Sequence, residues 1–268
     1  MIAHIADVEQ LNPLVSHVPD EAFRLMDAFW PGPLSLVLPK RKEVPDIVTA
    51  GHETVAVRMP AHPIARDLIR RTSTPVVAPS ANRFTCTSPT TARHVREQLG
   101  DRCGVIIDGG ACRVGVESTV ISFSGSTPVV LRPGGIPIEE LERLIGKVET
   151  RSTALRKSCA TESPGMMPNH YAPATDLLVF EEIPACFETQ SDIGVLLFLP
   201  SVKPFEGAVE ILSQSGDTKE AAANLFAALR RLDSLNLRLI VAEYTPARNL
   251  GNAINNRLLK AAGGRIRP

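Results

Sequence analysis

The chain has 268 residues, and its 29 lysines and arginines balance its 29 aspartates and glutamates, so the formal net charge is zero. This length predicts one large domain or two ordinary ones, and the neutral charge argues against a surface devoted to nucleic-acid phosphates. Five cysteines with no CxxC pair predict neither a disulfide framework nor a zinc site, and favour a reducing cytoplasm. The longest apolar stretch, 193–199, is far shorter than the roughly 20 residues that span a bilayer, so no membrane segment is predicted.

Residues 1–145 alternate between helical and strand-like patterns. The segment 19–30 places its apolar residues on one helical face, and Pro31 then ends the helix. Short apolar or β-branched runs bounded by Gly, Pro or Asn predict strands at 34–38, 54–58, 75–78, 104–107, 118–123 and 129–131, and helices fit at 63–71, 91–99 and 138–145. This mixture predicts an α/β or α+β domain.

Residues 146–173 differ in character, because they have no sustained period and contain three prolines. They predict a linker that either joins two domains or covers a site as a lid. Residues 174–268 then predict a second, smaller α/β domain. Its strands are expected at 177–180, 194–199 and 237–243, and its helices at 219–232 and 250–262.

The sequence VVAPSANRFTCTSPTT places small polar residues directly after a predicted strand. Ligands of α/β sheets bind outside the carboxyl ends of strands, so the Ser80 hydroxyl and the Asn82 amide could bind phosphate or sugar oxygens. Ser88 precedes a predicted helix, whose N-terminus would favour a phosphate. From spacing alone, a turn followed by a helix N-cap is the commoner explanation of the same residue types.

Four further motifs carry groups that could bind a ligand. TVAVRMP ends a predicted strand on Arg58, which suits a carboxylate but is also explained as a surface arginine. VESTV and LRPGG contribute Ser118 and Arg132, for which hairpin chemistry is the alternative. In the linker, His170 and Tyr171 are either ligand contacts or ordinary loop residues.

Taken in order, these motifs resemble the threonylcarbamoyl-adenylate synthase family, in its two-domain type with a YrdC-like catalytic domain. The matching pieces are His4-Ile5, WPGPLSLVL at 30–38, TVAVRMP, APSAN, VESTV, LRPGG and HYAP. The resemblance implies an α/β (α+β) fold, with a YrdC-like twisted mixed sheet and helices plus a smaller C-terminal Rossmann-like α/β domain. The implied ranges are 1–145 for the catalytic domain, 146–173 for the linker or lid and 174–268 for the C-terminal domain.

The resemblance also implies a nucleotidyltransferase activity. L-threonine, bicarbonate and ATP would give L-threonylcarbamoyl-adenylate (threonylcarbamoyl-AMP) and pyrophosphate, and a downstream threonylcarbamoyl-transferase would use the product to make N6-threonylcarbamoyladenosine in tRNA. ATP would come with Mg²⁺, and neither a tightly bound cofactor nor a protein metal site nor a catalytic nucleophile is implied. By analogy, L-threonine would contact His4, Arg58, Ala78 and Ser118, and ATP would contact Thr54, Ser80, Asn82, Ser88, Arg132 and Tyr171.

The sequence departs from the family pattern at its start. Family members have a strand, a threonine-rich segment and a Lys-Gly-Arg motif before the His-Ile pair, whereas here Met1 lies three residues before His4. We therefore expect the chain to lack this segment and its activity to be impaired. The alternative is a catalytically inactive, truncated paralogue that acts as a regulatory module or binds RNA weakly, for which Arg66, Arg70 and Arg71 lie at helical spacing.

Overall fold

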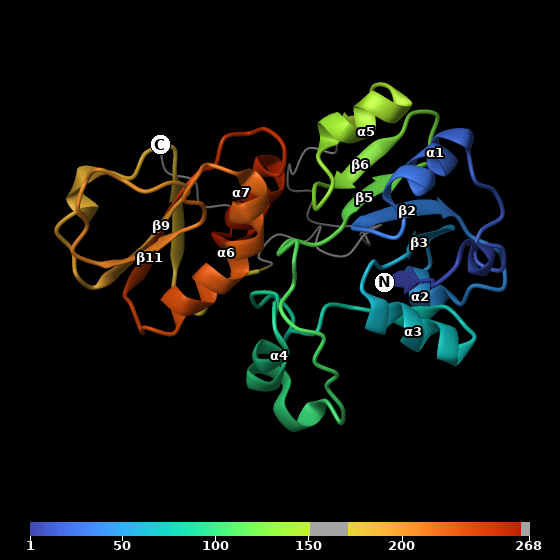
Figure 1. The fold of residues 1–268 in the computed structure, drawn as a ribbon, viewed down its shortest axis with the longest axis horizontal. Helices are drawn as coiled ribbons and strands as arrows, with labels where there is room; N and C mark the ends of the chain where they lie inside the picture. The colour runs from blue at the N-terminus through green and yellow to red at the C-terminus, as the bar shows by residue number, and fades with distance from the viewer. Residues whose placement is uncertain (151–170, 264–268) are drawn as a thin grey trace. The chain divides into compact units, whose positions relative to one another are not determined.

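The structure, a computed structural model, describes residues 1–150 and 171–263 (Figure 1). Most of the predicted linker, including His170, lies outside the described residues. The described residues form two compact units, one of residues 1–79 and 117–150 and the other of residues 80–116 and 171–263. Residues 80–116, expected in the first domain, thus group with the C-terminal residues. The predicted domain limits stay a prediction.

The first unit contains a seven-stranded mixed sheet in the order β4-β1-β3-β2-β5-β6-β7. Three neighbouring pairs are parallel (β1 with β3, β2 with β5, β6 with β7) and three are antiparallel. The mixed sheet expected from the sequence is confirmed. Its strands are β1 (Ile2–His4), β2 (Leu34–Pro39), β3 (Thr54–Arg58), β4 (Val76–Ala78), β5 (Thr119–Ser122), β6 (Val129–Arg132) and β7 (Glu149–Thr150).

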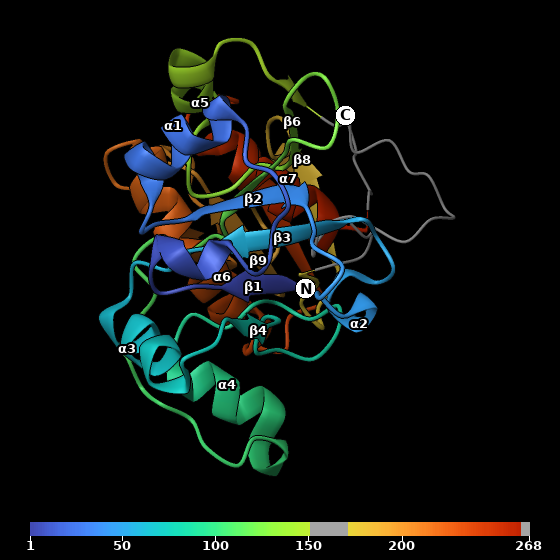
Figure 2. The ribbon, with the colours of Figure 1, turned by 90° about the vertical axis from the view of Figure 1, so that its right-hand side faces the viewer.

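The helices of the first unit bury one face of this sheet. Strand β2 directs Leu34, Leu36 and Leu38 into a core that also contains Leu25 and Leu141, because alternate strand residues share a face. These last two residues come from α1 (Asp20–Phe29) and α5 (Ile138–Ile145), which lie side by side in Figure 2. The remaining helices are η1 (Val8–Leu11), α2 (Asp46–Thr49) and α3 (Pro63–Thr72).

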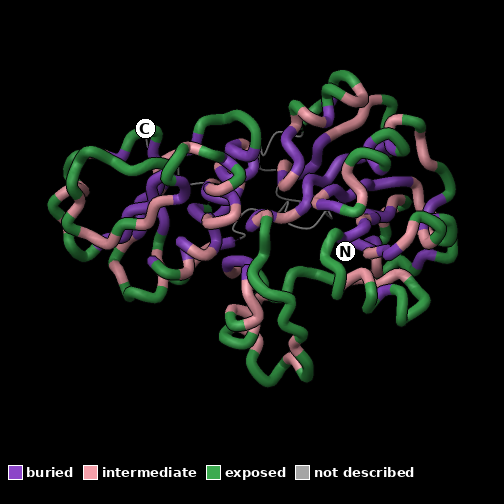
Figure 3. The backbone as a smooth tube through the Cα atoms, in the orientation of Figure 1, coloured by how far each residue is buried: buried purple, intermediate pink, exposed green. Residues whose placement is uncertain are grey.

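The second unit contains a four-stranded sheet that is wholly parallel, in the order β10-β9-β11-β8. Helices α6 and α7 contact each other and pack on one face of it. The chain is mostly buried along β9 and β11 (Figure 3), whereas β10 is only partly buried. This is the parallel α/β arrangement expected of the C-terminal residues. Its elements are β8 (Leu177–Phe180), η3 (Ala185–Phe187), β9 (Ile193–Leu197), β10 (Ala208–Ile211), α6 (Thr218–Asp233), β11 (Leu239–Glu243) and α7 (Gly251–Ala261), preceded in the chain by α4 (Ala92–Leu99) and η2 (Gly100–Arg102).

One predicted strand, 104–107, is wrong. The segment has no regular structure, and Val105 and Ile107 are 78% and 58% exposed. A run of β-branched residues forms a strand only where a partner strand and a buried face receive it, and this run has neither.

Candidate functional site

His4 and Arg58 lie side by side at the carboxyl ends of the parallel strands β1 and β3, where they are direct register partners. On the other side of β1, His4 pairs with Val76 of β4, and its Nδ1 lies 3.3 Å from the Val76 carbonyl oxygen. Because a carbonyl only accepts, Nδ1 carries the proton and Nε2 is an acceptor. Burial, with the nearby Arg58 charge, lowers the His4 pKa to about 4, so the ring is neutral at pH 7.

The turn before β2 orients Arg58. The Arg58 Nε donates to the Gly32 carbonyl oxygen at 3.0 Å, and the Gly32 amide donates to the Met59 carbonyl oxygen at 2.9 Å. A Cβ on Gly32 would lie only 2.1 Å from the Phe29 carbonyl oxygen, so this turn accepts glycine alone. The WPGP sequence therefore fixes the position of the Arg58 guanidinium.

Ser118 and Arg132 also meet: Ser118 directly precedes β5, and Arg132 ends β6. Arg132 is 3% exposed, and its Nη2 donates to the Ser118 carbonyl oxygen at 2.8 Å and to Ser118 Oγ at 3.1 Å. The Ser118 hydroxyl lies a further 2.8 Å from the Ser35 hydroxyl on β2. A buried guanidinium needs such partners, so these bonds fix the entry to β5.

Thr54 on β3 and Ala78 on β4 lie at other positions of the sheet than His4 and Arg58. Thr54 begins β3, so roughly 13 Å of extended chain separates it from Arg58. Ala78 pairs with Ile2, two register positions from the row that contains His4. The first unit thus brings His4 next to Arg58 and Ser118 next to Arg132, and holds Thr54 and Ala78 apart from His4 and Arg58.

The other expected residues belong to the second unit. The Asn82 side chain donates from Nδ2 to the carbonyl oxygens of Arg83 and Cys86, at 2.8 and 3.1 Å. Its Oδ1 is buried and has no hydrogen-bond partner among the residues that the structure describes. Ser80 is exposed and Ser88 is buried. The helix that follows is capped by Thr91, whose Oγ1 accepts from the His94 amide, so Ser88 is not the N-cap. The Tyr171 side chain is only 1% exposed.

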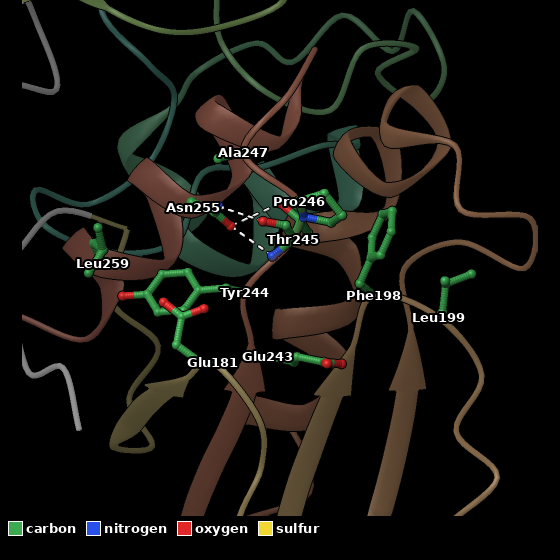
Figure 4. Close-up of a pocket in the computed structure, with 10 residues that line it drawn as sticks. All are labelled: Glu181, Phe198, Leu199, Glu243, Tyr244, Thr245, Pro246, Ala247, Asn255 and Leu259. Carbon is green, nitrogen blue, oxygen red and sulfur yellow. Dashed lines mark hydrogen bonds between the residues drawn. The ribbon is translucent and has the colours of Figure 1, made fainter. Parts of the chain in front are cut away.

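A cavity of about 580 Å³ lies in the second unit and contains none of the expected site residues (Figure 4). It opens at the carboxyl ends of three parallel strands, where Glu181 follows β8, Phe198 follows β9 and Glu243 ends β11. Asn255 of α7 fixes one wall: its Oδ1 accepts from the Thr245 amide and hydroxyl, both at 2.9 Å, and its Nδ2 donates to the Thr245 carbonyl oxygen at 2.8 Å. Burial, with the Glu182 charge, raises the Glu243 pKa. Sequence reasoning missed this cavity, although acidic residues at strand ends were visible.

The arginines considered for RNA binding are engaged in ion pairs. Arg66 and Arg70 of α3 approach Asp7 at 3.6 and 2.9 Å, and Arg71 pairs with Asp67 at 2.7 Å. Their charges are therefore offset locally, which weakens the case for a phosphate-binding stripe.

The described ranges, 1–150 and 171–263, contain neither a membrane-spanning helix nor a cluster of metal ligands. No helix there is long and apolar enough to cross a membrane. In the same residues, no three His, Cys, Asp or Glu side chains come together as metal ligands.

A mixed sheet with paired His4 and Arg58 at its strand ends, followed in the chain by a parallel sheet, defines a two-domain α/β protein with a YrdC-like first domain. Residues 1–134 match a family described as Telomere recombination, and residues 136–263 match the threonylcarbamoyl-AMP synthase C-terminal domain. The chain belongs to the threonylcarbamoyl-AMP synthase family.

Individual relatives match nearly the whole chain. The threonylcarbamoyl-AMP synthase of Pyrococcus abyssi is 43% identical, over 99% of this chain and 81% of the relative, and that of Bacillus subtilis is 42% identical, over 99% and 80%. The crystal structure of P. abyssi Sua5 complexed with L-threonine aligns with a TM-score of 0.89 and 41% identity, over 99% of this chain and 80% of that one. A variant of the P. abyssi protein with an adjacent His and Tyr both replaced by Ala aligns with a TM-score of 0.87.

Proposed function

We propose that this protein is an L-threonylcarbamoyladenylate synthase, which makes threonylcarbamoyl-AMP from L-threonine, bicarbonate and ATP. Family membership over nearly the whole chain supports this activity. The observation on which the substrate assignment rests is the adjacency of neutral His4 and Arg58 at the ends of two parallel strands. The relative whose structure aligns best among those described above was crystallised with L-threonine.

The threonine site would use two complementary groups. Arginine binds carboxylates through paired N–H donors, so Arg58 would receive the threonine carboxylate. His4 Nε2 is an acceptor, so it would accept a hydrogen bond from the threonine ammonium or hydroxyl group. Ser118 and Ala78 complete the proposed threonine contacts.

The ATP contacts are proposed on the basis of the family resemblance. The proposed ligands are Thr54, Ser80, Asn82, Ser88, Arg132 and Tyr171. Among them, the buried Asn82 Oδ1, which has no partner in the described part of the chain, fits an N–H or O–H donor of the nucleotide, because a buried acceptor without a partner is costly. Magnesium would accompany ATP, bound mainly by phosphate oxygens and water.

The reaction needs positioning more than a protein nucleophile. The threonine amine and bicarbonate form a carbamate with loss of water. A carbamate oxygen then attacks the α-phosphorus of ATP, the bond to the β-phosphate oxygen breaks, and pyrophosphate leaves with its electron pair. Placing these groups in line and stabilising the developing charge are contributions that polar side chains and arginines make.

The product is a mixed anhydride, so a transferase must consume it. A threonylcarbamoyl-transferase that modifies tRNA adenosine is the proposed downstream partner, and the proposed location is the cytoplasm. The RNA-binding alternative is not favoured, since family membership and the paired arginines of α3 both argue for the enzyme.

The test is pyrophosphate release from ATP that depends on threonine and bicarbonate. Arg58→Ala should raise the threonine KM by about tenfold or more, the effect of losing a charged hydrogen bond. Arg24→Ala removes an exposed arginine of α1 in the same unit and should leave the threonine KM unchanged. ATP turnover that is indifferent to threonine would exclude the proposed reaction, and equal KM values in the two variants would exclude the role of Arg58.

A further inference from the structure

The loop that carries Ser80, Asn82 and Ser88 is held by the C-terminal part of its own compact unit. Arg230 of α6 donates from Nη2 to the Thr87 carbonyl oxygen and from Nε to the Ser88 carbonyl oxygen, the latter at 3.3 Å. The Gln98 side chain donates from Nε2 to the same Thr87 carbonyl oxygen at 3.2 Å. Two consecutive carbonyls of the loop are thus bound by one planar guanidinium.

A second contact reaches this loop from the chain around Tyr171. The Ala172 amide donates to the Thr85 carbonyl oxygen at 2.9 Å, and Cys86 and Ala172 form a parallel β-bridge. The Thr87 hydroxyl donates to the Tyr171 carbonyl oxygen at 3.2 Å. The loop is therefore bound on its backbone at residues 85, 87 and 88.

The Tyr171 side chain anchors that second contact in the core. Its ring centroid lies 5.4 Å from the ring of Phe226 on α6, and the Arg257 guanidinium of α7 lies 5.4 Å from the same centroid. Tyr171 also adopts a left-handed backbone conformation, with φ of 71°. A non-glycine residue keeps this conformation only where its surroundings enforce it. Helices α6 and α7 therefore fix both contacts to the loop.

We propose that Arg230 is a positioning residue for ATP, which acts by holding the 85–88 backbone so that Ser80, Asn82 and Ser88 face the nucleotide. The inference rests on the proposed function, because that function assigns these three residues to ATP. Arg230 is partly buried, and desolvation lowers its pKa, which costs stability unless the guanidinium is well bonded. Its fork geometry suits two neighbouring carbonyls, whereas a lysine ammonium is a point charge. This gives the C-terminal residues a role in ATP binding that needs no direct contact with the substrate.

The test compares Arg230→Ala with Arg231→Ala, the matched control. Arg231 is the next residue of α6, but its guanidinium binds Glu210, at 2.7 Å through Nε. Arg230→Ala should raise the ATP KM by about tenfold, since it removes two charge-assisted hydrogen bonds, and should leave the threonine KM nearly unchanged. Arg231→Ala should change neither value. Equal ATP KM values in the two variants, or a parallel rise for both substrates in Arg230→Ala, would overturn the proposal.

Hydrogen–deuterium exchange gives a readout that does not depend on activity. Amides of residues 83–90 should exchange faster in Arg230→Ala than in Arg231→Ala, and equal exchange would overturn the proposal. If the wild-type protein released no pyrophosphate with threonine, the proposed function would fail while this measurement still decided whether Arg230 holds the loop. If thermal unfolding shows that Arg230→Ala does not fold, Arg230→Lys replaces it. The ATP KM and the exchange of residues 83–90 should then change in the same direction but by less.

Discussion

The hydroxyl groups of Ser35 and Ser118 lie 2.8 Å apart in a fully buried position, where they join strand β2 to the start of β5. Ser118 also receives the Arg132 guanidinium, so Ser35 is the member of this network that can be removed without touching a proposed substrate contact. Ser35→Ala should lower the free energy of unfolding by about 1 kcal/mol, the net value of a buried hydrogen bond. Urea denaturation measures this loss. Ser16→Ala, at an exposed serine, is the control, and an equal loss in both variants would contradict the prediction.

His4 should make the stability of the protein depend on pH. Its folded pKa of about 4 lies below the ordinary 6.5, so between these values the unfolded chain binds a proton that the folded protein does not. Stability should therefore fall as the pH is lowered from about 6.5 to 4, by up to about 3 kcal/mol from this group. His4→Gln should flatten the curve over this window, as measured by urea denaturation at several pH values. The exposed His17→Gln should keep the wild-type slope, and a wild-type slope in His4→Gln would refute the assignment.

Glu243 should make the stability of the protein depend on pH in the opposite direction to His4. Its pKa is raised, by burial and then by the Glu182 charge, so the folded protein holds a proton that the unfolded chain has lost. This contribution to stability is complete below the ordinary carboxyl pKa and disappears as the pH rises through the raised value. At pH 7.5, Glu243→Gln should therefore raise the thermal midpoint above that of the wild type, whereas Glu206→Gln, at an exposed site, should not. A lower midpoint for Glu243→Gln would mean that the carboxylate makes favourable contacts instead.

Asn255 should be the most sensitive polar residue of the cavity wall. Its amide makes three hydrogen bonds to Thr245, two as acceptor and one as donor. Asn255→Ala should cost about 2 to 3 kcal/mol, because Thr245 is buried and would keep unsatisfied groups. Chemical denaturation compares it with Asn252→Ala on the same helix, for which a small effect is expected. Similar losses in the two variants would show that helix propensity, rather than the Thr245 contact, dominates.

The local sequence pattern was enough to predict helices and strands whose apolar residues are regularly spaced. Strand 54–58 and helix 138–145 occur as expected, because their apolar residues have the period of the structure they form. Strand β10 (Ala208–Ile211) was not predicted, since it is short, partly exposed and contains a glutamate. Segment 104–107 was predicted as a strand but has no partner strand among the described residues, as expected if β structure depends on tertiary pairing.

The candidate site was predictable by residue type but not by its contacts. Strand-end position pointed to Arg58, and the order of motifs pointed to His4, yet their pairing depends on β1 lying beside β3. The hydrogen bonds of Arg132 to Ser118 and of Arg230 to the 85–88 backbone join residues far apart in the chain. The periodicity of apolar residues in the sequence does not predict such contacts, since they depend on the topology of the fold rather than on local pattern.

The grouping of residues 80–116 with residues 171–263 has a consequence for biosynthesis. A ribosome makes the first segment well before the second, so the backbone partners of residues 85–88 do not exist when that loop emerges. Contacts of such large sequence separation form late, because closing a long loop costs entropy before the contacts repay it. The first mixed sheet can be complete while residues 80–116 still await their partners. During that interval the segment lacks its native contacts, and transiently exposed apolar surface of this kind favours aggregation.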